Sequence, residues 1–201
     1  MEIWIGTTNK GKLAEMRPLL EKAFPELVVH SIEELPHYSQ PPEDGKTFLD
    51  NARIKARSVK VMKPGVWVLA EDSGLEVEGL GGLPGIHSAR YAGPHARDSE
   101  NVAKLLKMLQ IRSVANRNAR FLCTMVAFDP QGNEHIFTGE LKGVIGKNPV
   151  GQMGFGYDPV FVPLGETKSM AELGPAFKNK HSHRAQATLI LIDKILSQNK
   201  L

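Results

Sequence analysis

The chain has 201 residues, enough to bury a hydrophobic core within one domain. Its composition of 41% hydrophobic and 23% charged residues is that of a soluble globular protein, and a net charge of +3 is too small to indicate a nucleic-acid binder. The single cysteine, Cys123, excludes an internal disulfide framework and a multi-cysteine metal site.

The hydrophobic residues give no sign of a membrane protein. No apolar stretch approaches the roughly 18 residues that a membrane-spanning helix needs. The first residues enter a strand pattern and not a basic, cleavable leader. We therefore expect a cytoplasmic protein that has neither a membrane nor a nucleic acid as its partner. Cys123 lies in an apolar run and is expected to be a small core residue.

A polar loop joins the first predicted strand, residues 2–6, to a helix whose apolar residues recur from Leu13 to Phe24. The loop consists of Thr7, Thr8, Asn9, Lys10, Gly11 and Lys12. Backbone N–H groups at a helix amino terminus bind phosphate well, and the two lysines favour it further. Residues 6–12 also fit the nucleotide P-loop pattern, but Leu13 stands where that pattern needs Ser or Thr. We predict a phosphate-binding loop of another kind; the alternative is that Asn9 and Gly11 simply make a turn.

The next segment suggests a cap and a metal ligand. Val28 and Val29 indicate a second strand beside the first, and Thr47 with Asp50 has the spacing of a capping box, which predicts that a helix starts at Thr47. Glu43 lies just outside that helix, and either binds a metal ion or is a solvated loop acid. Asn51 and Lys55 share a helical face, where either could reach a phosphate or solvent.

Residues 66–70 form an apolar run that is followed by Glu71, Asp72, Ser73 and Gly74. The run predicts a strand buried on both faces that ends at the two acids. Adjacent carboxylates at such a position suit a cation or a general base, whereas the alternative is a solvated turn.

Several later segments are expected to form loops, a helix and a hairpin. Residues 79–91 contain four glycines and a proline, which indicates a shaped functional loop with His87 and Arg90 as possible contacts. Asp98 is expected to cap a helix. Residues 121–128 and 135–145 predict a β-hairpin that serves as scaffold.

Two segments near the end of the chain suit a ligand. Phe155 stands between glycines before Tyr157 and Asp158, which favours stacking of its ring on a planar base; the alternative is an aromatic plug in a turn. Ser182 is a natural cap, and the basic residues around it at a helix start suit an anion or a polar ligand.

Taken together, six motifs resemble those of the inosine triphosphate pyrophosphatase family. They are the Thr8–Asn9 loop, Glu43-x-Gly45-x-Thr47-Phe48, Glu71-Asp72-Ser73-Gly74, Gly82-x-Pro84-Gly85-x-x-Ser88-Ala89-Arg90-Tyr91, Phe155-Gly156-Tyr157-Asp158 and Ser182-His183-Arg184. The resemblance implies an α/β fold with an elongated central mixed β-sheet flanked by helices, in a single domain of residues 1–201 whose two lobes enclose the active-site cleft. It also implies a homodimer that uses Mg²⁺ to hydrolyse non-standard purine nucleoside triphosphates, namely ITP, dITP, XTP and dXTP, to the monophosphate and pyrophosphate.

The resemblance also assigns roles to individual residues. Glu43 and Asp72 would bind magnesium, and Asp72 would be the catalytic proton acceptor. Glu71 is a less certain ligand, because many relatives have Asp there. The residues that would bind substrate are Thr7, Thr8, Asn9, Lys10, Gly11, Lys12 and Ser73 at the phosphates, and Phe155, Gly156, Tyr157, Asp158, Lys178, His183 and Arg184 at the nucleoside. Because arginine only donates hydrogen bonds, Arg184 is expected to favour a six-oxo purine over adenine.

Two other functions stay open from the residues alone. A P-loop-type ATPase or kinase is favoured by residues 6–12 and disfavoured by Leu13. A non-catalytic nucleotide- or RNA-binding module would use Phe155, Tyr157 and Arg184 as a stacking platform.

Overall fold

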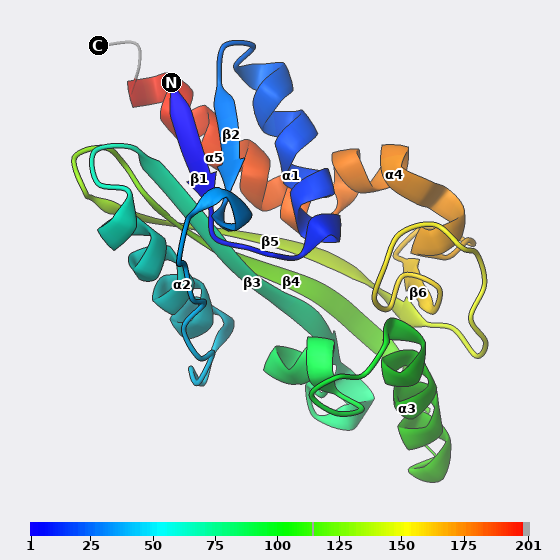
Figure 1. Ribbon diagram of the computed structural model, residues 1–201. Helices are drawn as coiled ribbons and strands as arrows, with labels where there is room; N and C mark the ends of the chain where they lie inside the picture. Colours follow the sequence, from blue (N-terminus) through cyan, green and yellow to red (C-terminus); the bar gives the residue numbers. More distant parts are fainter. Residues whose placement is uncertain (114, 199–201) are drawn as a thin grey trace. The chain divides into compact units, whose positions relative to one another are not determined.

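The computed structural model describes residues 1–113 and 115–198 (Figure 1). The strands are β1 (Glu2–Ile5), β2 (Val28–Ser31), β3 (Trp67–Val77), β4 (Asn118–Phe128), β5 (Glu134–Ile145) and β6 (Phe161–Pro163). The helices are α1 (Lys10–Ala23), α2 (Phe48–Met62), α3 (Asp98–Ile111), α4 (Met170–His181) and α5 (His183–Gln198), with short 3₁₀ segments η1 (Ile32–Glu34), η2 (Glu78–Leu80) and η3 (Gly85–Arg90).

The six strands form one sheet in the order β2-β1-β3-β4-β5-β6. Strand β1 pairs in parallel with β2 and β3, whereas β5 and β6 are antiparallel. The sheet is therefore mixed and the fold is α/β, as the family resemblance implies. The expected second strand beside the first is confirmed by β2, and the expected hairpin strands are confirmed as β4 and β5.

The described residues divide into two compact units. Unit 1 comprises those of Met1–Asp72, Cys123–Gly139 and Arg184–Leu201, and unit 2 comprises those of Ser73–Leu122 and Glu140–His183. The chain passes from one unit to the other within β3, between Asp72 and Ser73. The expected arrangement of two lobes around a cleft stays a prediction.

In unit 1 the sheet is buried on both faces because alternate strand residues point to opposite sides. Trp67 and Leu69 of β3 pack in one cluster with Met16 of α1 and Leu191 of α5. Val68 and Ala70, the residues in between, pack in a second cluster with Ala52, Ala56 and Val59 of α2. Helices α1 and α5 therefore cover one face of the unit 1 sheet, and α2 covers the other (Figure 1).

The starts of two helices follow from their capping residues. The Asn9 side chain accepts a hydrogen bond from the Lys12 backbone N–H at 3.1 Å, so α1 begins at Lys10 and the two lysines lie in its first turn. Thr47 and Asp50 form the expected capping box, in which each side chain accepts from the other's backbone N–H at 3.1 Å. Asp50 is thus a capping residue.

Three elements differ from expectation. Strand β3 does not end at Glu71 and Asp72 but continues to Val77. Asp98 is the first residue of α3 and not its cap, and its carboxylate accepts a hydrogen bond from the Gly156 N–H at 2.7 Å. Helix α4 is not foreseen by the sequence pattern, because Gly174 has a non-helical, positive φ of 74° and Pro175 follows it.

Unit 2 has its own core. Leu75 and Val77 of β3 pack there with Leu105 of α3, Phe161 of β6 and Met170 of α4. The glycine-rich residues 79–91 contain the end of η2 and all of η3. They are fixed by Ser88, whose hydroxyl accepts from the Leu75 N–H at 2.9 Å and donates to the Gly85 carbonyl at 2.6 Å. This loop is thus anchored on β3.

Within residues 1–113 and 115–198, no helix is both long enough and apolar enough to cross a membrane.

Candidate active site

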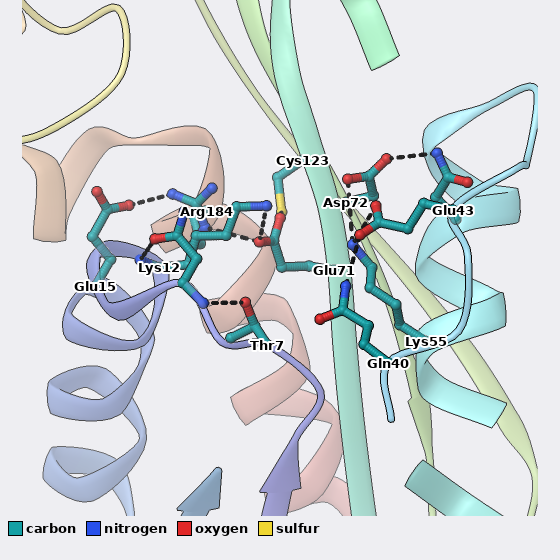
Figure 2. Close-up of polar contacts among 12 residues, drawn as sticks. Thr7, Lys12, Glu15, Gln40, Glu43, Lys55, Glu71, Asp72, Cys123 and Arg184 are labelled. Atoms are coloured by element: carbon teal, nitrogen blue, oxygen red, sulfur yellow. Dashed lines mark hydrogen bonds and ion pairs between the residues drawn. The ribbon is translucent and has the colours of Figure 1, made fainter. Parts of the chain in front are cut away.

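The two neighbouring acids of β3 point to opposite faces of the unit 1 sheet. Asp72 continues the row of Val68 and Ala70 toward α2, whereas Glu71 continues the row of Trp67 and Leu69 toward α1 and α5. Figure 2 shows Asp72 directed toward Lys55 and Glu43, and Glu71 directed toward Lys12 and Arg184. The acids therefore belong to two different polar clusters.

The first cluster surrounds Asp72. Lys55 of α2 places its Nζ 3.4 Å from Asp72 Oδ1 and 3.1 Å from Glu43 Oε2 (Figure 2). Asn51, one turn earlier on α2, donates from Nδ2 to Asp72 Oδ2 at 3.1 Å. Gln40 donates to the other Glu43 oxygen at 2.8 Å. The Glu43 and Asp72 carboxylates are thus gathered around one ammonium group.

Burial and charge set the protonation of this cluster. Burial raises the pKa of Asp72 above its ordinary value, and the nearby Glu71 and Glu43 charges raise it further, against the lowering effect of Lys55 and Lys12. Burial alone would lower the pKa of Lys55, but the charges of Asp72, Glu71 and Glu43 outweigh it and raise the pKa. A lysine cation therefore lies between two acids, and the pKa of one of them, Asp72, is raised.

The Asp72 cluster contains oxygen donors of the kind that a divalent metal ion uses. In the described part of the chain, no group of three or more His, Cys, Asp and Glu side chains is arranged to hold a metal. Mg²⁺, however, commonly uses one or two carboxylates and completes its shell with water and substrate phosphates. Glu43 and Asp72 supply two such hard oxygen donors, and they already attract the Lys55 cation.

The second cluster surrounds Glu71, which is fully buried. Lys12 Nζ lies 2.7 Å from Glu71 Oε1, and Arg184 Nε lies 3.6 Å from the same oxygen. Arg184 Nη1 also contacts Glu15 Oε2 at 2.6 Å, and the Cys123 thiol donates to Glu71 Oε2 at 3.5 Å. Burial would raise the pKa of Glu71, but the Lys12, Arg184 and Lys55 charges lower it well below its ordinary value.

These contacts do not favour Glu71 as a metal ligand beside Asp72, and its role as a ligand stays a prediction. Its carboxylate is directed to the other face of β3, where Lys12 and Arg184 neutralise it. Cys123 is buried as expected, and burial raises the pKa of its thiol well above the ordinary value.

The predicted phosphate loop remains accessible at its polar end. Thr8, Asn9 and Lys10 are exposed, whereas Thr7 is buried and its hydroxyl accepts a hydrogen bond from the Asn9 N–H at 3.1 Å. Gly11 and Lys12 follow in the first turn of α1 and are partly exposed. This end of α1 thus offers a helix amino terminus and two lysines, a suitable setting for an anion.

In unit 2, Asp158 organises the turn that carries Phe155. Its Oδ2 accepts from Lys178 Nζ at 2.6 Å and from the Phe155 N–H at 2.9 Å. The Lys178 ammonium consequently lies 4.5 Å from the centre of the Phe155 ring. A Cβ atom at Gly154 would meet Asp158 Oδ2 at 2.0 Å, so only glycine fits there. Phe155 and Gly156 also line a pocket of about 380 Å³ beside α3.

Three further residues that the resemblance places at the nucleoside are buried and contact other protein groups. Tyr157 is buried and donates its hydroxyl to the Ser88 carbonyl at 2.9 Å, so its ring is a core element and not a stacking surface. His183 is buried and stacks on Phe121 with the ring centres 4.9 Å apart. Arg184 is the first residue of unit 1 after His183, and its guanidinium lies among Glu15 and Glu71.

Glu15 is not part of any motif named above. Its partner, Arg184, is 169 residues away along the chain, so the sequence gives no sign that the two side chains meet. Asn51 and Lys55 are recognisable as one helical face, but only their burial shows that this face turns toward Asp72. Ser73 is partly buried on β3, His87 is exposed and Arg90 is partly exposed.

Comparison with known proteins identifies the family. The model of the Ham1 family matches residues 3–194. The chain belongs to the Ham1 family. It is 56% identical to the dITP/XTP pyrophosphatase of Bdellovibrio bacteriovorus, with 99% of this chain and 100% of that protein covered. It is also 44% identical to the dITP/XTP pyrophosphatase of Geobacter sulfurreducens, over 95% of this chain and 94% of the relative.

Solved structures of Ham1 proteins share the fold. The Staphylococcus aureus Ham1 protein has 36% identity and a TM-score of 0.87, with 98% of this chain and 100% of that chain covered. A HAM1 protein from Coxiella burnetii has 35% identity and the same TM-score, over 98% of this chain and 99% of that chain. The Ham1 relatives named dITP/XTP pyrophosphatases confirm the resemblance to the inosine triphosphate pyrophosphatase family that the motifs indicate.

Proposed function

We propose that the protein hydrolyses ITP, dITP, XTP and dXTP to the nucleoside monophosphate and pyrophosphate, and so removes these nucleotides from the pool. The observation that carries this proposal is the gathering of Glu43, Lys55 and Asp72. A whole-length relative at 56% identity that is named a dITP/XTP pyrophosphatase supports the choice of substrate.

Glu43 and Asp72 would hold Mg²⁺ through one carboxylate each. When bound, the ion would neutralise charge on the phosphate oxygens and help to orient the triphosphate. Asp72 would accept the proton of the attacking water as the anhydride between the α and β phosphates is cleaved. Its buried setting and raised pKa suit a base that must bind a proton.

The amino terminus of α1 would bind the triphosphate. Lys10, Lys12 and the polar loop from Thr7 to Asn9 provide positive charge and hydrogen-bond donors around backbone N–H groups. Ser73, next to Asp72 on β3, would assist there. Lys12 would serve two purposes, because it also neutralises the buried Glu71.

The nucleoside end would be bound by unit 2 residues, with Phe155 stacking on the base. Lys178 would donate to the six-oxo group of hypoxanthine or xanthine, where adenine presents an amino donor. Asp158 and Gly156 would shape the turn, Tyr157 would support it from the core, and His183 would border the base. The base-reading role of Arg184 stays a prediction, since its guanidinium is engaged by Glu15 and Glu71.

We further expect a homodimer and a cytoplasmic location, as the family resemblance implies.

The two rival functions are less well supported. Leu13 still stands where a P-loop needs a hydroxyl, and it packs partly buried against the core. An RNA-stacking platform would lack Tyr157, which is buried.

One assay separates these functions. The purified protein is incubated with Mg²⁺ and, in turn, ITP, dITP, XTP, ATP and GTP, and pyrophosphate and orthophosphate are measured separately. Release of pyrophosphate from ITP, dITP and XTP, abolished by a chelator, is expected. Release of orthophosphate from ATP would favour an ATPase, and the absence of any turnover would favour a binding module.

A further inference from the structure

Asn51 is a fully buried polar residue whose side chain joins two parts of the proposed metal site. Its Nδ2 donates to Asp72 Oδ2 at 3.1 Å, and its Oδ1 accepts from the Gly45 backbone N–H at 2.9 Å. The two partners fix the orientation of the amide, since a carboxylate can only accept from an NH₂ group and an N–H can only donate to an oxygen.

The Gly45 contact connects Asn51 to the segment that carries Glu43. A Cβ atom at Gly45 would lie 2.6 Å from Asn51 Oδ1 and 2.6 Å from Asp50 Cβ, so the backbone packs directly on the amide. The Thr47–Asp50 capping box fixes the next residues to α2. Glu43, two residues before Gly45, is therefore tied to the same helix turn that contacts Asp72.

We propose that Asn51 is a positioning residue that holds the Glu43 and Asp72 carboxylates at the spacing required by the metal ion. This inference rests on the proposed function. By engaging Asp72 Oδ2, Asn51 directs Oδ1 toward the side where Lys55 and Glu43 lie. Lys55 alone cannot fix this geometry, because an ammonium on a flexible stem has no preferred direction of contact.

The test uses Asn51→Leu, which has a similar volume and makes neither hydrogen bond, and Mn²⁺ as the probe. Manganese binding is titrated by electron paramagnetic resonance in the absence of nucleotide, and kcat and KM for ITP are measured in parallel. Loss of a group that orients metal ligands typically weakens metal affinity or activity about 10- to 100-fold. We expect a fall of this size in Mn²⁺ affinity and in kcat, with the affinity for inosine monophosphate unchanged.

Gly45→Ala tests the same connection from the other side, because it leaves the Asn51 and Asp72 side chains chemically unchanged but forces the Asn51 amide and the backbone of the Glu43 segment apart. It should also weaken Mn²⁺ binding, and it decides the question if Asn51→Leu does not fold. The matched control is Asn101→Leu. Asn101 is a buried asparagine of unit 2 that accepts from the Ala92 N–H and donates to the Ala89 carbonyl.

Asn101→Leu should lower the thermal midpoint and leave Mn²⁺ affinity as in the wild type. Wild-type Mn²⁺ affinity in folded Asn51→Leu, or in Gly45→Ala if Asn51→Leu does not fold, would overturn the inference and reduce Asn51 to a structural residue. If the wild type itself neither bound Mn²⁺ nor released pyrophosphate, the proposed function would fail, and the inference with it. If the wild type is active and the variants bind Mn²⁺ as tightly as it does, the inference on Asn51 is overturned and the proposed function stands.

Discussion

Asp72 is the residue on which the proposed chemistry depends most. Asp72→Asn keeps the size and the hydrogen bond from Asn51 but removes the proton acceptor and one metal ligand. Loss of a general base typically reduces the rate about 10²- to 10⁴-fold, and loss of a ligand adds to that. We expect a folded variant with almost no release of pyrophosphate. Turnover above about a tenth of the wild-type rate at saturating Mg²⁺ would remove Asp72 from this role.

Glu71 and Glu43 should respond differently to the same substitution. Glu43→Gln should weaken Mn²⁺ binding, because it removes a proposed ligand, whereas Glu71→Gln should leave it nearly unchanged. Glu71→Gln should instead lower the free energy of unfolding by about 3 to 5 kcal/mol, since Lys12 and Arg184 would lose a buried anion. Calorimetric Mn²⁺ titration and urea unfolding of both variants check this. Equal loss of Mn²⁺ affinity in both would restore Glu71 as a ligand.

For single residues, the sequence predicts contacts between residues close together along the chain better than contacts between residues far apart along it. The Thr47–Asp50 cap is encoded by a spacing of three residues, and the structure confirms it. The partners of Glu15 and Asn51 lie 169 and 21 residues away, so no local pattern could indicate them. The partners of Asp72 and Glu71 differ because the two side chains point to opposite faces of β3, and which element covers each face is known only from the tertiary structure.

Among the elements, α1 and α5 are linked by a buried ion pair between Glu15 and Arg184. Removing one partner of such a pair leaves an uncompensated charge in the interior. Arg184→Met should therefore lower the free energy of unfolding by about 3 to 5 kcal/mol. Arg97→Met is the control, because the Arg97–Glu100 pair is exposed to solvent and should contribute little to the free energy of unfolding. Similar losses in both variants would contradict the structural role of Arg184.

The preference for six-oxo purines should depend on α4, through Lys178. Lys178→Met removes the ammonium that Asp158 holds beside the Phe155 ring. Hydrolysis of ITP should fall far more than that of ATP, since the donor to the six-oxo group is lost. Measured ratios of kcat/KM for the two nucleotides test this. If Arg184→Met lowers the ratio and Lys178→Met does not, the base is read by Arg184, as the donor chemistry of arginine predicts.

Element types were easier to predict than element ends. The strands and the helices with a clear apolar period, such as α1 and α2, are where the sequence indicates. Strand β3 was expected to end at the acids because polar residues commonly follow buried strands. It continues because Leu75 and Val77 enter the core of unit 2, a contact that only the tertiary structure provides.

On the scale of the whole molecule, the α/β class with a mixed sheet was predicted through the family resemblance, and the pairing of β1 with both β2 and β3 accounts for the β2-β1-β3 part of the sheet order. The division into two compact units could not be predicted from linkers, because the chain passes between the units inside strands and near the start of α5.

The family resemblance also predicts that two copies associate. Sedimentation velocity at micromolar concentration should give twice the chain mass of 22.1 kDa. A species of single-chain mass across the concentration range would contradict the dimer but would leave the proposed chemistry intact, because the Glu43, Lys55 and Asp72 cluster lies within one chain.

The alternation of Glu71 and Asp72 on β3 limits how this strand can change in evolution or engineering. β1 and β3 are aligned with Ile5 opposite Leu69, just before the acids. Inserting or deleting one residue between Leu69 and Glu71 would send each carboxylate to the opposite face, and would place Glu71 near α2 and Asp72 near α1. A two-residue change would restore the faces but shift the acids along the strand by about 7 Å. Length changes should therefore be tolerated in the loops around this strand and rejected within it.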